Sequence, residues 1–351
     1  MVTEFERVLQ AHAARYPLME PQDYGKLAYQ NHFGAEHLVS DEGQMLRRIR
    51  EEWDSLTADL PIRGPENIGG GLCRFYLNHD IEKDIAAQML VKLFCMTAKE
   101  AKNPPDEFQE KLLMLENLSV PGMREWLEEY RGRGCPPVRH SEKYRSAYHP
   151  HYRLLKREYA AVFPALLETA KVLKEKGRAV VAIDGRCGSG KSSLARLMEQ
   201  VFSCNVFHMD DFYLPVGQRA ENWLEIPGGN MDLVRFRREV LDGVFGGQAV
   251  DYRAFDCGAG AYMAPVRVEF TPLTVIEGSY SHHPALQAEY DLKLFITCGK
   301  QEQLRRLKER EGDYFPTFER LWMPLEEQYI RLCGIEDNNV LTVDTGETFE
   351  F

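Results

Sequence analysis

The chain has 351 residues, 44% of them hydrophobic and 28% charged, and its formal net charge is −11. This composition is typical of a soluble globular protein with room for two domains, and it excludes disorder on a large scale. Residues 1–150 carry 19 basic against 24 acidic side chains, so the sequence offers no basic surface that would hold nucleic acid by counterion release.

The first half, residues 1–150, predicts a mainly helical domain. Stretches 80–101 and 105–118 place apolar residues three and four positions apart, as in a helix with one buried face. Residues 151–177 predict a long linking helix, kinked near Pro164, that leads into the second half.

Histidines are concentrated in two stretches of the first half, 29–42 and 139–152. They admit two interpretations: a metal site or second active site, or ordinary capping and surface histidines. No H-E-x-x-H motif occurs, and the role of this half stays open. The stretch 139–152 is also rich in Arg and Tyr, which favours either recognition of an anionic substrate or docking of the two halves. The candidate metal ligands are His32, His37, His140 and His149.

From residue 178 onward, short apolar runs alternate with amphipathic ones. Such alternation predicts a parallel sheet covered by helices on both faces. The predicted helices span 191–202, 231–245, 300–311 and 317–333. The five predicted strands are "RAVVAID", "NVFHMD", "LTVIEG", "LKLFITC" and "NVLTVD".

The segment "AIDGRCGSGKSS" (182–193) matches the phosphate-binding pattern G-x-x-x-x-G-K-[ST] in full, between a predicted strand and a predicted helix. Glycines let the backbone curl so that its N–H groups point at phosphates, and the helix start adds positive charge. Lys191 would reach the β- and γ-phosphates, and the Ser192 hydroxyl would ligate Mg²⁺. The predicted nucleotide-binding residues are Gly185, Arg186, Cys187, Gly188, Ser189, Gly190, Lys191, Ser192 and Ser193.

Acidic residues end two of the predicted strands, at the edge where parallel sheets carry their chemistry. Asp210 and Asp211 follow the second strand, in "HMDDFY", and Glu277 ends the third, in "VIEGSY". Asp210 is a candidate base toward a substrate hydroxyl, and Glu277 a candidate Mg²⁺ ligand. The alternatives are a turn or helix cap for the aspartates and a solvated strand end for Glu277.

Arginines follow the fourth strand, in the helical segment "LRRLKERE". Arginines that close over a transferred phosphate would compensate its charge and exclude water. The alternative is a solvated, salt-bridged helix face. The candidate lid arginines are Arg305, Arg306 and Arg310, and the spacing does not select among them.

Together these segments resemble the uridine kinase and phosphoribulokinase-like group of P-loop kinases, over about residues 178–345. The resemblance implies that Asp210 is the base toward the acceptor and that Lys191 and Ser192 bind the phosphates and Mg²⁺. It also implies that Glu277 is the acid of the third strand and that Arg306 and Arg310 are the lid arginines. "FDCGAGAYM" (255–263) departs from the family by lacking the histidine and arginine that help read a pyrimidine. Uridine is therefore not indicated as the acceptor.

The acceptor pocket is expected beside Asp210 and between the loops 222–232 and 252–262. The aromatic residues of these loops could stack on a ring or simply pack. The candidate substrate residues are Asp211, Tyr213, Trp223, Tyr252 and Phe255.

We therefore expect an α/β fold with a P-loop NTPase-type parallel sheet flanked by helices over 178–351, preceded by a mainly α-helical domain. The expected function is ATP- and Mg²⁺-dependent phosphoryl transfer to a hydroxyl of a small metabolite, such as a nucleoside or another sugar-containing compound. The rival is a nucleotide-dependent switch or regulatory ATPase whose helical half binds a protein partner. The Asp-x-Phe-Tyr element favours the kinase, because a switch needs no base facing an acceptor.

The cellular setting follows from the cysteines and the hydropathy. The eight cysteines form no C-x-x-C pair, which argues against a disulfide framework or a Cys-based zinc site. No apolar run approaches the ~18 residues needed to span a bilayer. We expect a cytoplasmic protein with no membrane or nucleic-acid partner, and assembly into a homo-oligomer is left open.

Overall fold

The structure is a computed structural model that describes residues 2–100, 105–336 and 339–346. The chain forms two compact units divided between Ala160 and Ala161, called here the N-terminal and C-terminal units. The division falls within helix α8 (Arg157–Lys176). In the described part of the chain no helix combines the length and apolarity needed to cross a membrane.

The N-terminal unit is mainly helical, and it also contains a small sheet that the sequence did not predict. The antiparallel strands β1 (Glu66–Gly69), β2 (Leu72–Tyr76) and β3 (Tyr152–Lys156) lie side by side in that order. The helices are α1 (Glu4–Arg15), α2 (Pro21–Phe33), α3 (Glu42–Asp54), α4 (Lys83–Glu100), α5 (Pro105–Glu116), α6 (Met123–Gly132) and α7 (Glu142–Tyr148), with a 3-10 turn at Glu36–Leu38.

Strand β3 corrects the prediction of a continuous helix over 151–177, because the helix begins only at Arg157. Strand β3 pairs with β2 from Tyr152 opposite Tyr76 to Lys156 opposite Leu72. A short apolar run next to a helix has no period that distinguishes strand from helix. The strand is therefore decided by a partner far away in the sequence.

A buried polar network holds the N-terminal unit together. Arg74 on β2 is fully buried and donates to Glu66 Oε2 at 3.2 Å and to Gln30 Oε1 at 3.1 Å. His140 contacts Asp23 Oδ1 through Nδ1 at 2.9 Å. Because a carboxylate only accepts, Nδ1 carries the proton and Nε2 accepts from the Tyr152 hydroxyl at 2.7 Å. The network therefore joins α2 to strands β1, β2 and β3.

Two buried histidines, His140 of this network and His12 of α1, predict acid sensitivity of the N-terminal unit. Burial lowers the pKa of His140 to about 3 and that of His12 to about 4. Because both values lie below those of the unfolded chain, the unfolded state takes up protons first. The contribution of the two neutral histidines to the free energy of unfolding is therefore complete above about pH 6.5. It is lost as the pH falls toward the folded pKa, by up to about 1.4 kcal/mol per pH unit for each histidine.

Pulse proteolysis in urea, with fragments of the N-terminal unit identified by mass, measures this loss between about pH 7 and about pH 5. His140→Gln is expected to flatten the pH dependence, whereas the matched change of the exposed His79 to Gln should leave the slope as it is. An equal slope in the two variants would contradict the assignment.

The C-terminal unit has a five-stranded sheet in which every neighbouring pair is parallel. Its order is β12-β11-β4-β10-β5, so β4 is central. All five predicted strands are present. They are β4 (Ala179–Gly185), β5 (Asn205–His208), β10 (Leu273–Glu277), β11 (Leu292–Thr297) and β12 (Leu341–Asp344).

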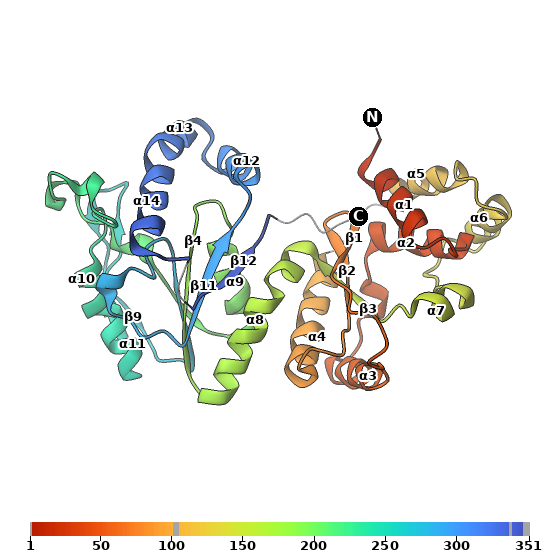
Figure 1. The fold of residues 1–351 in the computed structure, drawn as a ribbon, viewed down its shortest axis with the longest axis horizontal. Coiled ribbons are helices and arrows are strands. Elements are labelled where there is room, and N and C mark those ends of the chain that lie inside the picture. The colour runs from red at the N-terminus through yellow and green to blue at the C-terminus, as the bar shows by residue number, and fades with distance from the viewer. Residues whose placement is uncertain (1, 101–104, 337–338, 347–351) are drawn as a thin grey trace. The chain divides into compact units, whose positions relative to one another are not determined.

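Helices cover both faces of this sheet (Figure 1). Helix α9 (Lys191–Phe202) packs on β4, β5 and β10. The other face belongs to one apolar core that includes Ala182 and Ile276 of the strands, Phe236 of α10 (Leu233–Phe236) and Tyr329 of α14 (Met323–Cys333). The buried central strands therefore lack the alternation of a half-exposed sheet.

The remaining helices and strands of this unit are short apart from α12, and two predicted helices are each interrupted by a π-helical turn. The predicted helix 231–245 is realised as α10, a π-helix (Arg237–Leu241) and α11 (Asp242–Gly246). The predicted helix 317–333 is realised as α13 (Phe315–Thr317), a π-helix (Phe318–Trp322) and α14. Helix α12 spans Lys300–Glu311, and the short strands are β6 (Val250–Tyr252), β7 (Phe255–Asp256), β8 (Ala261–Tyr262) and β9 (Val266–Val268).

Candidate active site

The loop between β4 and α9 is formed by glycines in backbone conformations that other residues avoid. Gly185 has φ of +140°, and a Cβ there would lie 2.0 Å from the Ile296 carbonyl oxygen of β11. Gly190 is left-handed (φ +104°) and caps the N-terminus of α9. The loop can therefore follow the sheet edge closely and direct the helix N-terminus toward an anion.

Lys191 is 8% exposed and its ammonium lies within this loop. Nζ donates to the Gly185 carbonyl at 2.6 Å and to that of Arg186 at 3.1 Å, and it lies 3.9 Å from Glu326 Oε1. Arg186 points elsewhere, donating to Glu327 at 2.6 Å and Glu336 at 2.9 Å. Of these two cations, Lys191 is thus the one whose charge lies within the loop.

Strand register brings Glu277 to the same edge. Glu277 ends β10 opposite Ile183 of β4 and His208 of β5. Its Oε1 accepts from Ser192 Oγ at 3.0 Å, and its Oε2 lies 2.7 Å from His208 Nδ1. Burial by itself would raise the pKa of Glu277, but the hydrogen bond from His208 and the charge of Lys191 outweigh it and hold that pKa below its usual value. Glu277 is therefore an anion beside the Ser192 hydroxyl.

Asp210 and Asp211 follow β5 in a 3-10 turn (Met209–Phe212) and face different partners. Asp210 is exposed, and its Oδ1 accepts from the Tyr213 hydroxyl at 3.0 Å. Asp211 is half-buried, and its Oδ2 accepts from Tyr252 at 3.4 Å. Burial raises the pKa of Asp211. Asp210 is the more accessible of the two carboxylates.

The aromatic candidates divide into packed and partly exposed side chains. Phe255 is buried, and Tyr252 stacks on Phe212 with ring centroids 5.7 Å apart. Trp223 is only partly buried, and its ring lies 6.4 Å from that of Trp322 in the π-helix before α14. The loop 222–232 and the C-terminal helical segment therefore meet at Trp223.

The two lid arginines that the resemblance implies have different surroundings. Arg306 donates to the Gly188 and Ser189 carbonyls at 3.4 Å and to the Thr345 carbonyl at 2.8 Å. Arg310 is exposed and donates to Glu311 at 2.5 Å. Arg306 thus braces the glycine loop between β4 and α9, which we also call the phosphate loop, and Arg310 lies at the surface of α12.

Two buried acids at this edge were missed by the sequence reasoning. Glu326 of α14 accepts from the Cys187 backbone N–H at 2.7 Å and from the Ser279 hydroxyl. Asp184 accepts from the Tyr329 hydroxyl at 2.7 Å. No local pattern marks Glu326, whereas the position of Asp184 just before the first loop glycine could have drawn attention to it.

The histidine-rich stretches do not assemble a metal site. Within the described ranges, no group of three or more His, Cys, Asp or Glu side chains could hold a metal ion. His140 is engaged by Asp23 and Tyr152, and His32 packs edge-on to Phe33 with centroids 4.5 Å apart. These two side chains are accounted for by the packing of the unit.

No family model matches the chain, and no curated protein matches its sequence. Among solved structures it is similar to a possible uridine kinase from Bacillus stearothermophilus, at 18% identity over 48% of this chain and 89% of that one, with a TM-score of 0.38. It is also similar to a putative fructose transport system kinase from Silicibacter sp. TM1040 (22% identity, 47% and 89% covered, TM-score 0.37). A deoxyadenosine kinase from M. mycoides matches at 13% identity, with 48% and 91% covered and a TM-score of 0.26.

Each of these matches covers about half of this chain. The C-terminal unit is an α/β unit with a parallel sheet flanked by helices, in which β4 leads through the glycine loop into α9. The fold class predicted for this half is confirmed.

Proposed function

We propose that the C-terminal unit transfers the γ-phosphoryl group of ATP to a hydroxyl of a small metabolite. The observation that supports this most is the meeting of Lys191, the Ser192–Glu277 pair and Asp210 at the carboxyl ends of β4, β10 and β5. Hydrolysis of the nucleotide would need only Lys191 and the Ser192–Glu277 pair. An exposed carboxylate beside them adds a base for an acceptor.

The donor atoms fit Mg²⁺. A hydroxyl oxygen and a carboxylate oxygen lie 3.0 Å apart, and hard oxygen ligands are those that Mg²⁺ prefers, together with water and substrate phosphates. Ser192 and Glu277 would hold the ion, Glu277 directly or through water. When bound, the ion would neutralise charge on the β- and γ-phosphates.

In the proposed transfer, Asp210 accepts the proton of the acceptor hydroxyl as its oxygen bonds to the γ-phosphorus. The bond from that phosphorus to the bridging oxygen breaks, and ADP leaves. Lys191 and the loop N–H groups stabilise the charge on the phosphates, and Arg310 of α12 supplies further positive charge when the lid closes. Tyr213 orients Asp210 through its hydroxyl.

The acceptor is proposed to bind between Asp210 and the loop 222–232, with Trp223 against its ring. The hydrogen-bonded side chains of Asp211 and Tyr252 would line the inner side of this site, and the buried Phe255 would support that side by packing. When the site closes, Trp322 would move closer to Trp223.

The test is nucleotide turnover with Mg²⁺ and either ATP or GTP, over a panel of nucleosides, sugars and sugar alcohols. We expect at least one acceptor to raise ADP or GDP release well above the acceptor-free rate and to appear in phosphorylated form by mass spectrometry. Slow hydrolysis that no acceptor stimulates, with a protein partner held in only one nucleotide state, would instead support a switch.

A further inference from the structure

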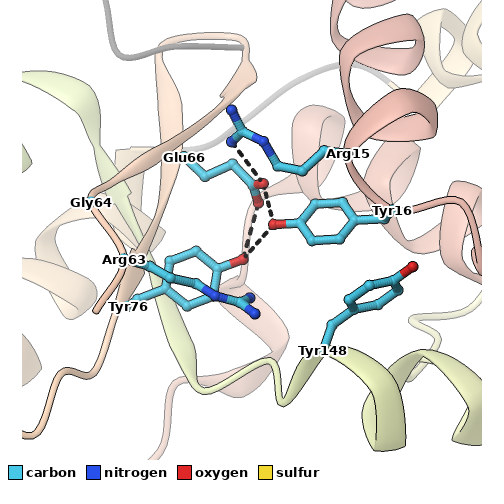
Figure 2. A pocket seen from close by; sticks show the side chains of 7 residues that line it. All are labelled: Arg15, Tyr16, Arg63, Gly64, Glu66, Tyr76 and Tyr148. Carbon is cyan, nitrogen blue, oxygen red and sulfur yellow. Dashed lines mark hydrogen bonds and ion pairs between the residues drawn. The ribbon is translucent and has the colours of Figure 1, made fainter. Parts of the chain in front are cut away.

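A pocket of about 370 Å³ opens in the N-terminal unit, remote in sequence from the phosphate loop. It is formed where α1 ends, just before and at the start of β1, at the end of β2 and at the end of α7 (Figure 2). Its volume is in the range of small-molecule sites. Six of the side chains that line it are Arg15, Tyr16, Arg63, Glu66, Tyr76 and Tyr148.

The Glu66 carboxylate forms the floor of the pocket, and its oxygens already accept hydrogen bonds from neighbouring side chains. Glu66 accepts from the Tyr16 hydroxyl at 2.5 Å, from the Tyr76 hydroxyl at 3.1 Å and from the buried Arg74 at 3.2 Å. Burial alone would raise the pKa of Glu66, but Arg74 and the other partners hold it below the usual value. The charge of Glu66 is thus compensated from beneath by Arg74, which does not line the pocket.

Two further guanidinium groups line the pocket from opposite sides of this carboxylate in Figure 2. Arg15 reaches Glu66 Oε1 at 3.4 Å. Arg63 lies over the Tyr76 ring, 5.1 Å from its centroid, and its Nη1 is buried with no hydrogen-bond partner among the described residues. Among the residues that line the pocket, two guanidinium groups stand against one carboxylate, and Arg74 pairs with that carboxylate from outside the pocket. The lining therefore carries an excess of positive charge. Guanidinium forks match carboxylate and phosphate oxygens.

Aromatic rings form a wall beside these donors. Tyr16 and Tyr148 meet edge-on with centroids 4.9 Å apart, and Tyr148 is partly exposed. Such rings bind the flat or apolar body of a ligand, while the guanidinium groups fix its charged end.

We propose that this pocket binds a small organic anion, with its carboxylate or phosphate between Arg15 and Arg63 and its body against Tyr16 and Tyr148. The site is independent of the phosphoryl transfer proposed above. The ligand class follows from the net positive charge of the lining and from the buried, unpartnered Nη1 of Arg63, next to an aromatic wall.

Calorimetric titration of the full chain at low ionic strength tests the site, with phenyl phosphate and benzoate as the two anionic probes and phenol as the neutral one. We expect at least one anion to bind and phenol not to bind over the same concentrations. Arg63→Gln should weaken that binding at least about tenfold. The tighter of the two anions identifies phosphate or carboxylate as the preferred group.

Controls separate this pocket from the phosphate loop. Lys191→Ala should leave binding of the anionic probe unchanged, and so should Arg48→Gln, which alters an exposed arginine of α3. If Arg63→Gln fails to fold, Arg15→Gln and Tyr148→Leu give the same comparison. The proposal is overturned if neither anion binds, if phenol binds equally well, or if Lys191→Ala removes the binding that Arg63→Gln leaves intact.

Discussion

Asp210→Asn is expected to lower acceptor-dependent kcat by about 10²–10⁴-fold. The amide keeps the size of the side chain and its hydrogen bond with the Tyr213 hydroxyl, but it cannot take the proton of an acceptor. Because Asp210 lies outside the glycine loop, nucleotide affinity should stay within about threefold, a difference of less than 1 kcal/mol. Steady-state turnover and nucleotide titration of the same preparation check both values.

A matched control is Asp242→Asn, which alters an exposed aspartate paired with Arg237 in the same unit. Its turnover should equal that of the unaltered chain. Should Asp210→Asn retain full acceptor-dependent turnover, Asp210 is not the base. Should it lose nucleotide binding and turnover together, its role is structural.

Arg74→Met is expected to destabilise the N-terminal unit by about 3–5 kcal/mol. Methionine fills much of the same space, but it leaves the Glu66 carboxylate buried without the cation that compensates it, and it removes the donors to Gln30. The measurement is the urea dependence of pulse proteolysis, followed on fragments from β1 to β3.

Two comparison variants locate the cause of this loss. Arg133→Met removes an exposed ion pair with Glu129 and should cost less than about 1 kcal/mol. Adding Glu66→Gln to Arg74→Met removes the buried negative charge that Arg74 compensates and should restore part of the stability. If the double variant is no more stable than Arg74→Met, lost packing rather than buried charge explains the effect.

Much of the C-terminal unit could be predicted from the sequence because its signals are local. Each strand is a short apolar run, the glycine loop has a fixed spacing, and Asp210 and Glu277 directly follow or end strands. The interior of the N-terminal unit could not be predicted in this way. Strand β3 and the Glu66–Arg74 pair depend on partners that periodicity does not reveal.

Some residues of the candidate site also lacked a local signal. Glu326 reaches the phosphate loop from α14, and His208 meets Glu277 only through the pairing of β5 with β10. Arg306 and Arg310 share a helix and a residue type, yet one braces the loop and the other is exposed. Helix orientation, which sequence spacing does not fix, separates them.

The glycine loop, the five strands and the acidic residues at or just after the strand ends can be predicted from local sequence, because backbone conformation and strand burial are set by neighbouring residues. Which side chains meet is a matter of tertiary structure: the Ser192–Glu277 pair, the small sheet of the first half, and the pocket that Arg63 and Glu66 both line. Contacts between distant segments depend on packing and register, which are properties of the whole fold.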